Sequence, residues 1–417
     1  MDGSGALIVS CGGGKGGAGK SLVASNLGIA LARLGMRTVL VDADLGAANL
    51  HTMFGIDQPG ATLGALLDRR VRSLEEVAIP TGEPRLFLVP GTGAVVGSAN
   101  IAHTQKTKLL AHIRRIDADV VIVDVGAGTA FNTLDLFDLG DVRLVVATPQ
   151  LTSVQNAYAF IKGAVHRSLR AAAQTDEERE LLASASDRTE TERGGHSVAR
   201  VEQQNPALAA RMRAMIAGFG GAIVGNQVEG PAQRNVFFAL ARMARDFLGV
   251  TLPVVAELPL DPDLRRSITA RKPYLYTYST GPIAKAFGQI AEHVVSANLQ
   301  EIRSARALVE VEALPAPRDD EFGVNISSYL RREVRVAVDW PAELRSGGAA
   351  FPVRVVDLSP RGALVASKAA LSNGVRIELR VAYHPEPIVG TVRHVRPGYV
   401  GLEFDAAHEV LLTSTRR

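Results

Sequence analysis

Two lysines flank a glycine-rich loop near the start of the chain, in the stretch "CGGGKGGAGKSLVASN". Gly14, Gly19, Lys20 and Ser21 fit the spacing G-x-x-x-x-G-K-[ST], directly after the apolar run "ALIVSC" and directly before a helical pattern. Glycines at such positions let backbone N–H groups turn inward around phosphate oxygens, and the N-terminal end of the following helix adds positive charge. The spacing and its context predict a nucleotide-binding site.

The residues of this loop have distinct expected tasks. Lys20 should reach the β and γ phosphates of a bound nucleotide, and the Ser21 hydroxyl should ligate Mg²⁺. Backbone contacts to the phosphates are expected from four glycines, namely Gly14, Gly16, Gly17 and Gly19. The alternative is a glycine-rich turn that carries a surface lysine.

Three carboxylates stand at the ends of predicted strands. Asp42 and Asp44 close the strand in "VLVDADLGAANLH", and residues two apart on a strand point to the same side. Asp124 closes "DVVIVDV" and is followed by Gly126 and Gly128. Acidic residues at strand ends often only cap a helix. After a phosphate loop, we favour a role at the nucleotide.

The order of the apolar runs predicts the fold. Strand-like runs alternate with helical segments in the first part of the chain, which favours a mostly parallel, doubly wound α/β sheet with helices on both faces. The expected strands are "ALIVSC", "RTVLVDA", "RLFLVPG", "DVVIVDV", "RLVVATP", "GAIVGN" and "LPVVAEL". Ligands of such sheets bind beyond the C-terminal ends of the strands, where the loop and the carboxylates should meet.

Breaks in this pattern divide the 417 residues. We expect a nucleotide-binding domain at residues 1–311, a linker at 312–325 and a small antiparallel β-barrel at 326–417. The charged, Ala-rich stretch 165–216 indicates a mostly helical insertion with a flexible centre near Gly194 and Gly195.

A later helical pattern places four apolar residues on one face, Ile283, Phe287, Ile290 and Val294. We expect this face to pack on the sheet. A peripheral membrane contact is the alternative.

Composition narrows the class of protein. The apolar runs are far shorter than the roughly 20 residues that span a bilayer, and no charged-then-apolar leader opens the chain. Cys11 is the only cysteine, which excludes an internal disulfide or a multi-cysteine metal site. We expect a soluble, unexported, cytoplasmic protein. The formal net charge is +3, and residues 326–417 carry 13 basic and 9 acidic side chains. This excess could attract an anionic ligand, but an excess of this size is more often only a solvated surface.

The segment "KGGAGKS" resembles the deviant Walker A motif of the MinD/ParA group of P-loop ATPases. In that family the early lysine reaches the phosphates of the partner subunit, which implies this role for Lys15 and a homodimer on ATP binding. A cation presented only on dimerisation would stabilise the charge spread over the γ-phosphate oxygens. The resemblance also places Asp42 near Mg²⁺ and its water, has Asp44 orient the attacking water, and makes Asp124 the Walker B carboxylate.

The same resemblance extends to the side of the site that would hold the base. Asn226 matches the position where relatives hold adenine by a side-chain amide, which can donate and accept at once; a turn-forming role is the alternative. Pro259 and Asp261 are further candidates on the base-side loop. The stretch "TPQLTSVQNAYAFIK" is similar to one typical of the FlhG or FleN branch, where this region borders the dimer and the partner surface.

Near the C-terminus, "YLRREVRVAVDW" and "VVDLSPRGALVAS" resemble the two signatures of the PilZ domain, R-x-x-x-R and [DN]-x-S-x-x-G. The matching residues are Arg331, Arg335, Asp357, Ser359 and Gly362. The resemblance implies cyclic di-GMP as a regulatory ligand, since guanidinium groups can fork onto guanine or phosphate. The alternative is a barrel that has lost its ligand and only mediates contacts.

Together these features favour an ATP-dependent dimerising switch ATPase that positions or counts a cellular assembly, such as a flagellum or a pilus, under control of cyclic di-GMP. Its expected partners are a second copy and an unidentified protein activator or cargo, at a cell pole or the inner membrane. Two alternatives stay open: a cyclic di-GMP effector whose ATPase fold is a docking platform, and a ParA-like DNA-partition ATPase. DNA is disfavoured, because the first domain has no concentrated Lys/Arg run.

Overall fold

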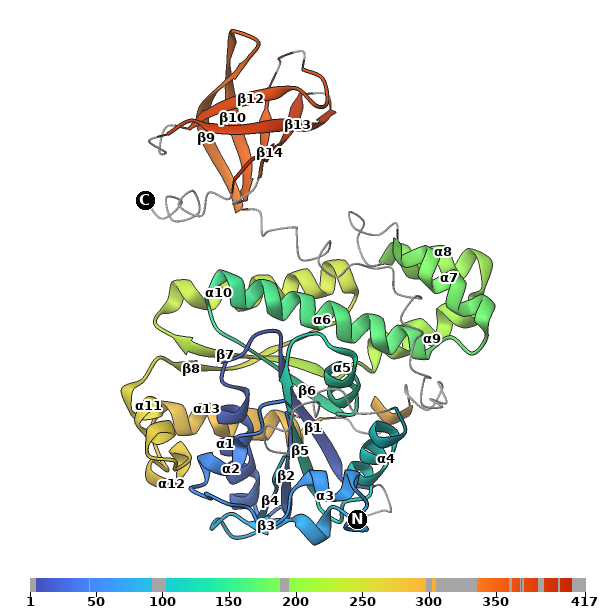
Figure 1. Ribbon diagram of the computed structural model, residues 1–417, viewed down its shortest axis with the longest axis vertical. Helices are drawn as coiled ribbons and strands as arrows, with labels where there is room; N and C mark the ends of the chain where they lie inside the picture. The colour runs from blue at the N-terminus through green and yellow to red at the C-terminus, as the bar shows by residue number, and fades with distance from the viewer. Residues whose placement is uncertain are drawn as a thin grey trace. The chain divides into compact units, whose positions relative to one another are not determined.

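The structure is a computed structural model, and it describes most of the chain (Figure 1). The described residues are 5–44, 46–91, 103–187, 195–297, 302–304, 336–359, 362–367, 369, 371–381, 386–396 and 398–406. They belong to two units, Met1–Pro317 and Arg318–Arg417.

The first unit is built on a mostly parallel sheet, as predicted from the order of the apolar runs. In the described residues its strands are β1 (Leu7–Gly13), β2 (Thr38–Ala43), β3 (Ile79–Pro80), β4 (Leu86–Val89), β5 (Val120–Ala127), β6 (Val142–Ala147), β7 (Gly221–Val228) and β8 (Val254–Pro259). Their spatial order is β3-β4-β2-β5-β1-β6-β7-β8, and only the β3–β4 pair is antiparallel. The two-residue strand β3 is an addition to the seven predicted strands.

Helices connect these strands. Those in the described residues are α1 (Lys20–Arg33), α2 (Leu50–Met53), α3 (Leu63–Leu67), α4 (His103–Arg114), α5 (Phe131–Asp138), α6 (Leu151–Ala171), α7 (Asp176–Asp187), α8 (Gly195–Gln204), α9 (Pro206–Ala217), α10 (Pro231–Met243), α11 (Pro262–Thr269), α12 (Tyr274–Thr277) and α13 (Pro282–Val295). The first unit also has a 3₁₀ turn at Glu75–Val77 and a π-helical turn at Ala244–Leu248.

The helices cover both faces of the sheet, because successive strand residues point to opposite sides. Ile8 and Val121 lie in a core with residues of α3, α4, α5, α6 and α10. Val9 and Ile122 lie in a second core with residues of α1, α2, α11, α12 and α13. Fully burying one such side chain contributes about 1.5–3 kcal/mol, so the two cores fix the strand register that positions the site.

Helix α13 packs on the sheet, which confirms the expected use of its apolar face. Ile283, Phe287, Ile290 and Val294 are all buried in the second core. That face is therefore not available to a membrane in the folded unit. Among the described residues, no helix is both long and apolar enough to cross a bilayer.

Helices occupy the described part of the stretch predicted as an insertion. Helix α6 runs on to Ala171, and α7, α8 and α9 follow it. Their apolar side chains form a separate small core with the end of α6, which includes Ala172, Val201 and Met212. Gly195 begins α8, whereas Gly194 lies outside the described residues.

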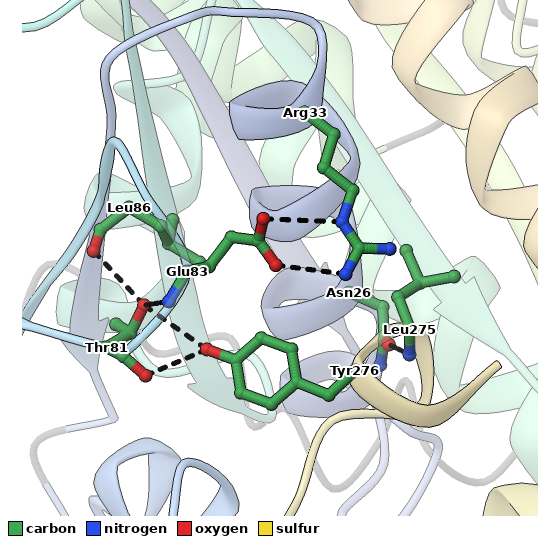
Figure 2. A network of polar contacts seen from close by, with 7 residues as sticks. All are labelled: Asn26, Arg33, Thr81, Glu83, Leu86, Leu275 and Tyr276. Atoms are coloured by element: carbon green, nitrogen blue, oxygen red, sulfur yellow. Dashed lines mark hydrogen bonds and ion pairs between the residues drawn. The ribbon is translucent and has the colours of Figure 1, made fainter. Parts of the chain in front are cut away.

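A polar network holds the segment that follows α11 (Figure 2). Its residues are Asn26, Arg33, Thr81, Glu83, Leu86, Leu275 and Tyr276. The Tyr276 hydroxyl donates to the carbonyl oxygen of Thr81 at 2.8 Å, and the Leu275 N–H donates to Oδ1 of Asn26 at 2.9 Å. The network ties α12 to α1 and to the turn before β4.

The second unit is a closed antiparallel barrel, as predicted. Its strands are β9 (Val336–Ser346), β10 (Ala349–Ser359), β11 (Gly362–Ala366), β12 (Arg376–Val381), β13 (Ile388–Arg396) and β14 (Tyr399–Phe404). They close in the order β10-β11-β14-β13-β12-β9. Leu344, Val355, Leu379 and Val392 are among the side chains that fill the interior.

Candidate nucleotide and metal site

The predicted phosphate loop connects β1 to α1. Gly17 and Gly19 have φ of 77° and 100°, the left-handed region that favours glycine. A Cβ atom at Gly14 would lie 1.9 Å from the carbonyl oxygen of Asn156 in α6, so a side chain does not fit there. Gly16, by contrast, has no atom within 4 Å of the place where a Cβ would stand. The loop is thus packed against α6 at one end and open at its outer edge.

Lys20 and Ser21 begin α1 next to Asp124. The Lys20 side chain is buried. Burial and the charge of Asp42 raise the pKa of Asp124, and a hydrogen bond from Ser21 and the charge of Lys20 only partly oppose that rise. The loop lysine and serine predicted from the sequence therefore lie beside Asp124, near the C-terminal end of β5.

Asp42 and Asp124 stand side by side on adjacent parallel strands, since their Cα atoms are partners in the β2–β5 register. Both are buried. Burial raises the pKa of Asp42 to about 6, although it accepts hydrogen bonds from the N–H groups of Leu50 at 2.9 Å and Asp44 at 3.3 Å. Burial, and then the charge of Asp42, raise the pKa of Asp124 to about 7. Two carboxylates in this setting repel each other when both are ionised.

These oxygen donors fit Mg²⁺. That ion is usually bound through one or two carboxylates together with substrate phosphates and water. Oδ1 of Asp124 is buried and has no hydrogen-bond partner within the described residues. A divalent cation between Ser21, Asp42 and Asp124 would satisfy this atom and remove the repulsion between the two carboxylates.

Asp44 lies beside the C-terminal end of β5. Its Oδ1 accepts hydrogen bonds from the N–H groups of Gly46 at 3.3 Å and Ala47 at 3.0 Å, which fix the carboxylate. A Cβ at Gly126 would lie 3.1 Å from the same oxygen. Gly128 has φ of 93°, and its N–H donates to the carbonyl oxygen of Gly13. Asp44 thus lies against Gly126, and the backbone at Gly128 is joined to Gly13, the residue directly before the phosphate loop.

Lys15 points to the start of α6. Its Nζ donates to Oε1 of Gln150 at 3.4 Å and to Oγ1 of Thr152 at 3.3 Å. Sequence reasoning missed these two acceptors, although both stand in the stretch that resembles the FlhG or FleN branch. The one clue in the sequence was Lys15 itself, because an amine in the loop needs hydrogen-bond acceptors nearby.

On the predicted base side, the polar groups are engaged within the protein. Nδ2 of Asn226 donates to the carbonyl oxygen of Ala18 in the phosphate loop at 2.8 Å, and its Oδ1 accepts from the N–H of Gln227 at 2.9 Å. Asp261 caps α11 by accepting from the N–H of Asp263 at 2.7 Å, and Pro259 ends β8. Asn226 thus supports the loop in this structure, and adenine binding by these residues stays a prediction.

The barrel places part of the second predicted site. Asp357 and Ser359 stand on β10 after an irregularity in the register between Val355 and Asp357, and Gly362 opens β11 opposite Ser359. A Cβ at Gly362 would lie 2.5 Å from the carbonyl oxygen of Leu402 in β14, so glycine is required by the barrel itself. Arg331 and Arg335 lie outside the described residues.

Comparisons with known proteins agree with this division of the chain. Residues 6–168 match the ParA family model, described as NUBPL iron-transfer P-loop NTPase, and residues 329–414 match the PilZ domain model. With Cys11 as its only cysteine, the chain lacks the thiolates that ligate an iron–sulfur cluster.

Curated relatives resemble the first unit. The antiactivator FleN of Pseudomonas aeruginosa is 25% identical over 292 residues, which cover 69% of this chain and 86% of FleN. The flagellum site-determining protein YlxH of Helicobacter pylori is 32% identical over 151 residues, which cover 36% of this chain and 50% of YlxH. Among solved structures, MinD complexed with Mg-ADP from Pyrococcus horikoshii gives a TM-score of 0.48 at 19% identity, covering 73% of this chain and 100% of that one.

The phosphate loop, the match to the ParA family model and the similarity to FleN define the first unit as a P-loop ATPase domain of the MinD/ParA family. The chain joins this domain, whose relatives include FleN and MinD-like proteins, to a C-terminal PilZ domain.

Proposed function

We propose that this chain is an ATP-dependent dimerising switch that positions or counts a cellular assembly. One observation carries the proposal: the amine of Lys15 lies at the exposed start of α6, whereas Lys20 is buried beside Asp124. In this proposal Lys20 serves the phosphates of its own subunit. Lys15, whose amine donates to Gln150 and Thr152 of its own chain in this structure, would reach the phosphates of a second subunit on dimerisation.

The residues of the site divide the work of hydrolysis. The loop N–H groups and Lys20 would hold the phosphates, while Ser21, Asp42 and Asp124 would hold Mg²⁺, which neutralises phosphate charge when bound. Asp44, fixed by two backbone N–H groups, would orient a water molecule. The water oxygen bonds to the γ-phosphorus as the bond to the bridging oxygen breaks, which yields ADP and phosphate. The Lys15 of a second copy would stabilise the charge on the γ-phosphate oxygens.

Equilibrium sedimentation with Mg²⁺ and a non-hydrolysable ATP analogue tests the dimer. We expect wild type to dimerise and Lys15→Ala to remain a monomer. Lys285→Ala is the matched control, because Lys285 is an exposed lysine of α13. A wild-type monomer with every nucleotide would refute the proposal.

Phosphate release distinguishes a switch from a docking platform. We expect wild type to release phosphate and Asp44→Ala to release at least about a hundredfold less, the scale on which loss of one group acting in the transition state is felt. Equal, near-zero rates in both would favour the alternative of a cyclic di-GMP effector with an inactive ATPase fold.

Cyclic di-GMP is the regulatory ligand in this proposal. The PilZ match and the placement of Asp357, Ser359 and Gly362 around the end of β10 support it. Calorimetry should show heat of binding that Arg331→Ala abolishes. Arg376→Ala is the control, since Arg376 is engaged in an ion pair with Asp405 on the barrel surface. No heat with intact protein would reject cyclic di-GMP control and leave the ATPase proposal standing.

The assembly is inferred from relatives whose names refer to the determination of a flagellum site and a septum site. A fluorescent fusion in the native cell should form ATP-dependent foci at a pole or at the inner membrane, and a protein activator or cargo should be recovered with them. Salt-sensitive binding to nonspecific DNA would instead favour the ParA-like partition alternative.

A further inference from the structure

Arg271 adopts a backbone conformation that glycine normally supplies. It follows α11 with φ of 55°, in the left-handed region that side chains disfavour. The Arg271 N–H donates to the carbonyl oxygen of Ile268, and the Lys272 N–H donates to that of Ser267, both at 3.0 Å. Such a turn closes many helices, and glycine is its usual residue. An arginine held there against preference suggests that its side chain has a task.

The side chain reaches a different segment of the unit. Nε of Arg271 donates to the carbonyl oxygen of Thr52, the third residue of α2, at 3.2 Å. The guanidinium also forms an ion pair with Asp57, which follows α2. The backbones approach closely at the same point, since a Cβ at Gly55 would lie 3.4 Å from the carbonyl oxygen of Arg271. Arg271 therefore braces α2 against the end of α11.

Helix α2 in turn holds a carboxylate of the metal site. The N–H of Leu50, its first residue, donates to Oδ2 of Asp42 at 2.9 Å. Leu50 and Thr52 belong to the same single turn, so a shift of Thr52 moves the donor to Asp42. At its other end, α11 begins at its cap Asp261, on the predicted base side of the nucleotide.

We propose that Arg271 is a positioning residue for ATP hydrolysis, which couples the base-side helix α11 to Asp42 through α2. This inference rests on the proposed ATPase site. It assigns no contact between Arg271 and the nucleotide.

Arg271→Gly is the decisive variant, because it removes the brace and leaves a residue suited to the backbone. We expect kcat to fall about tenfold, since small misplacements of catalytic groups are costly, while the affinity for Mg²⁺-free ADP stays within about twofold. The Mg²⁺ concentration for half-maximal activity should rise. Arg85→Gly is the matched control, because Arg85 is an exposed arginine with φ of 66° in the turn before β4.

Asp57→Ala weakens the same brace from the opposite side. It should lower kcat in the same direction, and the double variant with Arg271→Gly should be no slower than Arg271→Gly alone. His51 gives a separate readout by NMR: burial, and then the charge of Arg271, lower its pKa, so Arg271→Gly should raise it.

The possible outcomes separate the two proposals. An Arg271→Gly protein with unchanged kcat and Mg²⁺ requirement, whether or not its unfolding temperature falls, overturns the positioning role. A wild type that releases no phosphate from ATP overturns the proposed function instead.

Discussion

Replacing Asp124 by asparagine should stabilise the nucleotide-free protein while abolishing its response to Mg²⁺-ATP. The Asp124 carboxyl is buried next to Asp42, and both effects raise its pKa from 3.8 to about 7. Between these two values the folded protein holds a proton that the unfolded chain has lost. Stability therefore falls as the pH rises through this window, and asparagine, which does not ionise, escapes the penalty.

The magnitude follows from the width of that window. A shift of about 3 units at about 1.36 kcal/mol each gives about 4 kcal/mol at pH 8, where the folded carboxyl must also ionise. At pH 5 only the interval between the unfolded pKa of 3.8 and the pH counts, which is about 1 unit and so about 1–2 kcal/mol. The Asp124→Asn protein should thus gain more stability at pH 8 than at pH 5.

Urea unfolding of metal-free, nucleotide-free protein at both pH values measures this difference. The control is Asp141→Asn, because the buried Asp141 carboxylate accepts from the N–H of Ile8 at 3.0 Å and pairs with Arg303 at 3.0 Å. That variant should lose stability. Mg²⁺-ATP should stabilise wild type by mass action but leave Asp124→Asn unchanged. An Asp124→Asn protein less stable than wild type at pH 8, or a gain independent of pH, would refute the reasoning.

Three further substitutions test close contacts. Gly14→Ala should destabilise the ATPase unit by about 1–3 kcal/mol in urea unfolding, because the added Cβ meets the backbone of α6. Gly16→Ala is the control and should change the free energy of unfolding by less than about 0.5 kcal/mol. Equal effects of the two substitutions would contradict the contact between Gly14 and α6. Asn226→Ala should cost about 1–3 kcal/mol in urea unfolding, because it removes the donor to the carbonyl oxygen of Ala18 in the loop. A reduced preference for ATP over GTP in competition binding would show that the amide also reads adenine. Gly362→Ala should lower the unfolding temperature of the barrel, since overpacking against Leu402 costs about 1–3 kcal/mol; an unchanged temperature would show that β14 yields.

Much of the ATPase fold could be predicted because its signals are local. Each long parallel strand is a continuous apolar run, since both of its faces are buried. The proximity of Asp42 and Asp124 could be predicted because parallel strands bring their carboxyl ends to the same edge of the sheet. The apolar face of α13 was likewise readable from helical spacing, and its burial confirms the expected packing.

The remaining features depend on contacts between distant parts of the chain. The acceptor Gln150 lies 135 residues from Lys15, and no sequence pattern in either segment predicts the contact between them. Asn226 was expected to face a base, but its amide direction depends on the position of the phosphate loop beside it. Arg271 is invisible in sequence, because neither its left-handed backbone nor its contact with Thr52 leaves a local pattern. The short strand β3 has too few residues to show a period.

The contact between Gly14 and α6 makes the phosphate loop sensitive to distant events. Helix α6 has 21 residues, a length of about 31 Å, and its far end is built into the small core of α7, α8 and α9. Near its other end, the backbone of α6 at Asn156 packs directly against the backbone of the phosphate loop at Gly14. If a partner bound to α7, α8 and α9 and shifted α6 along its axis, the phosphate loop would have to move with the helix.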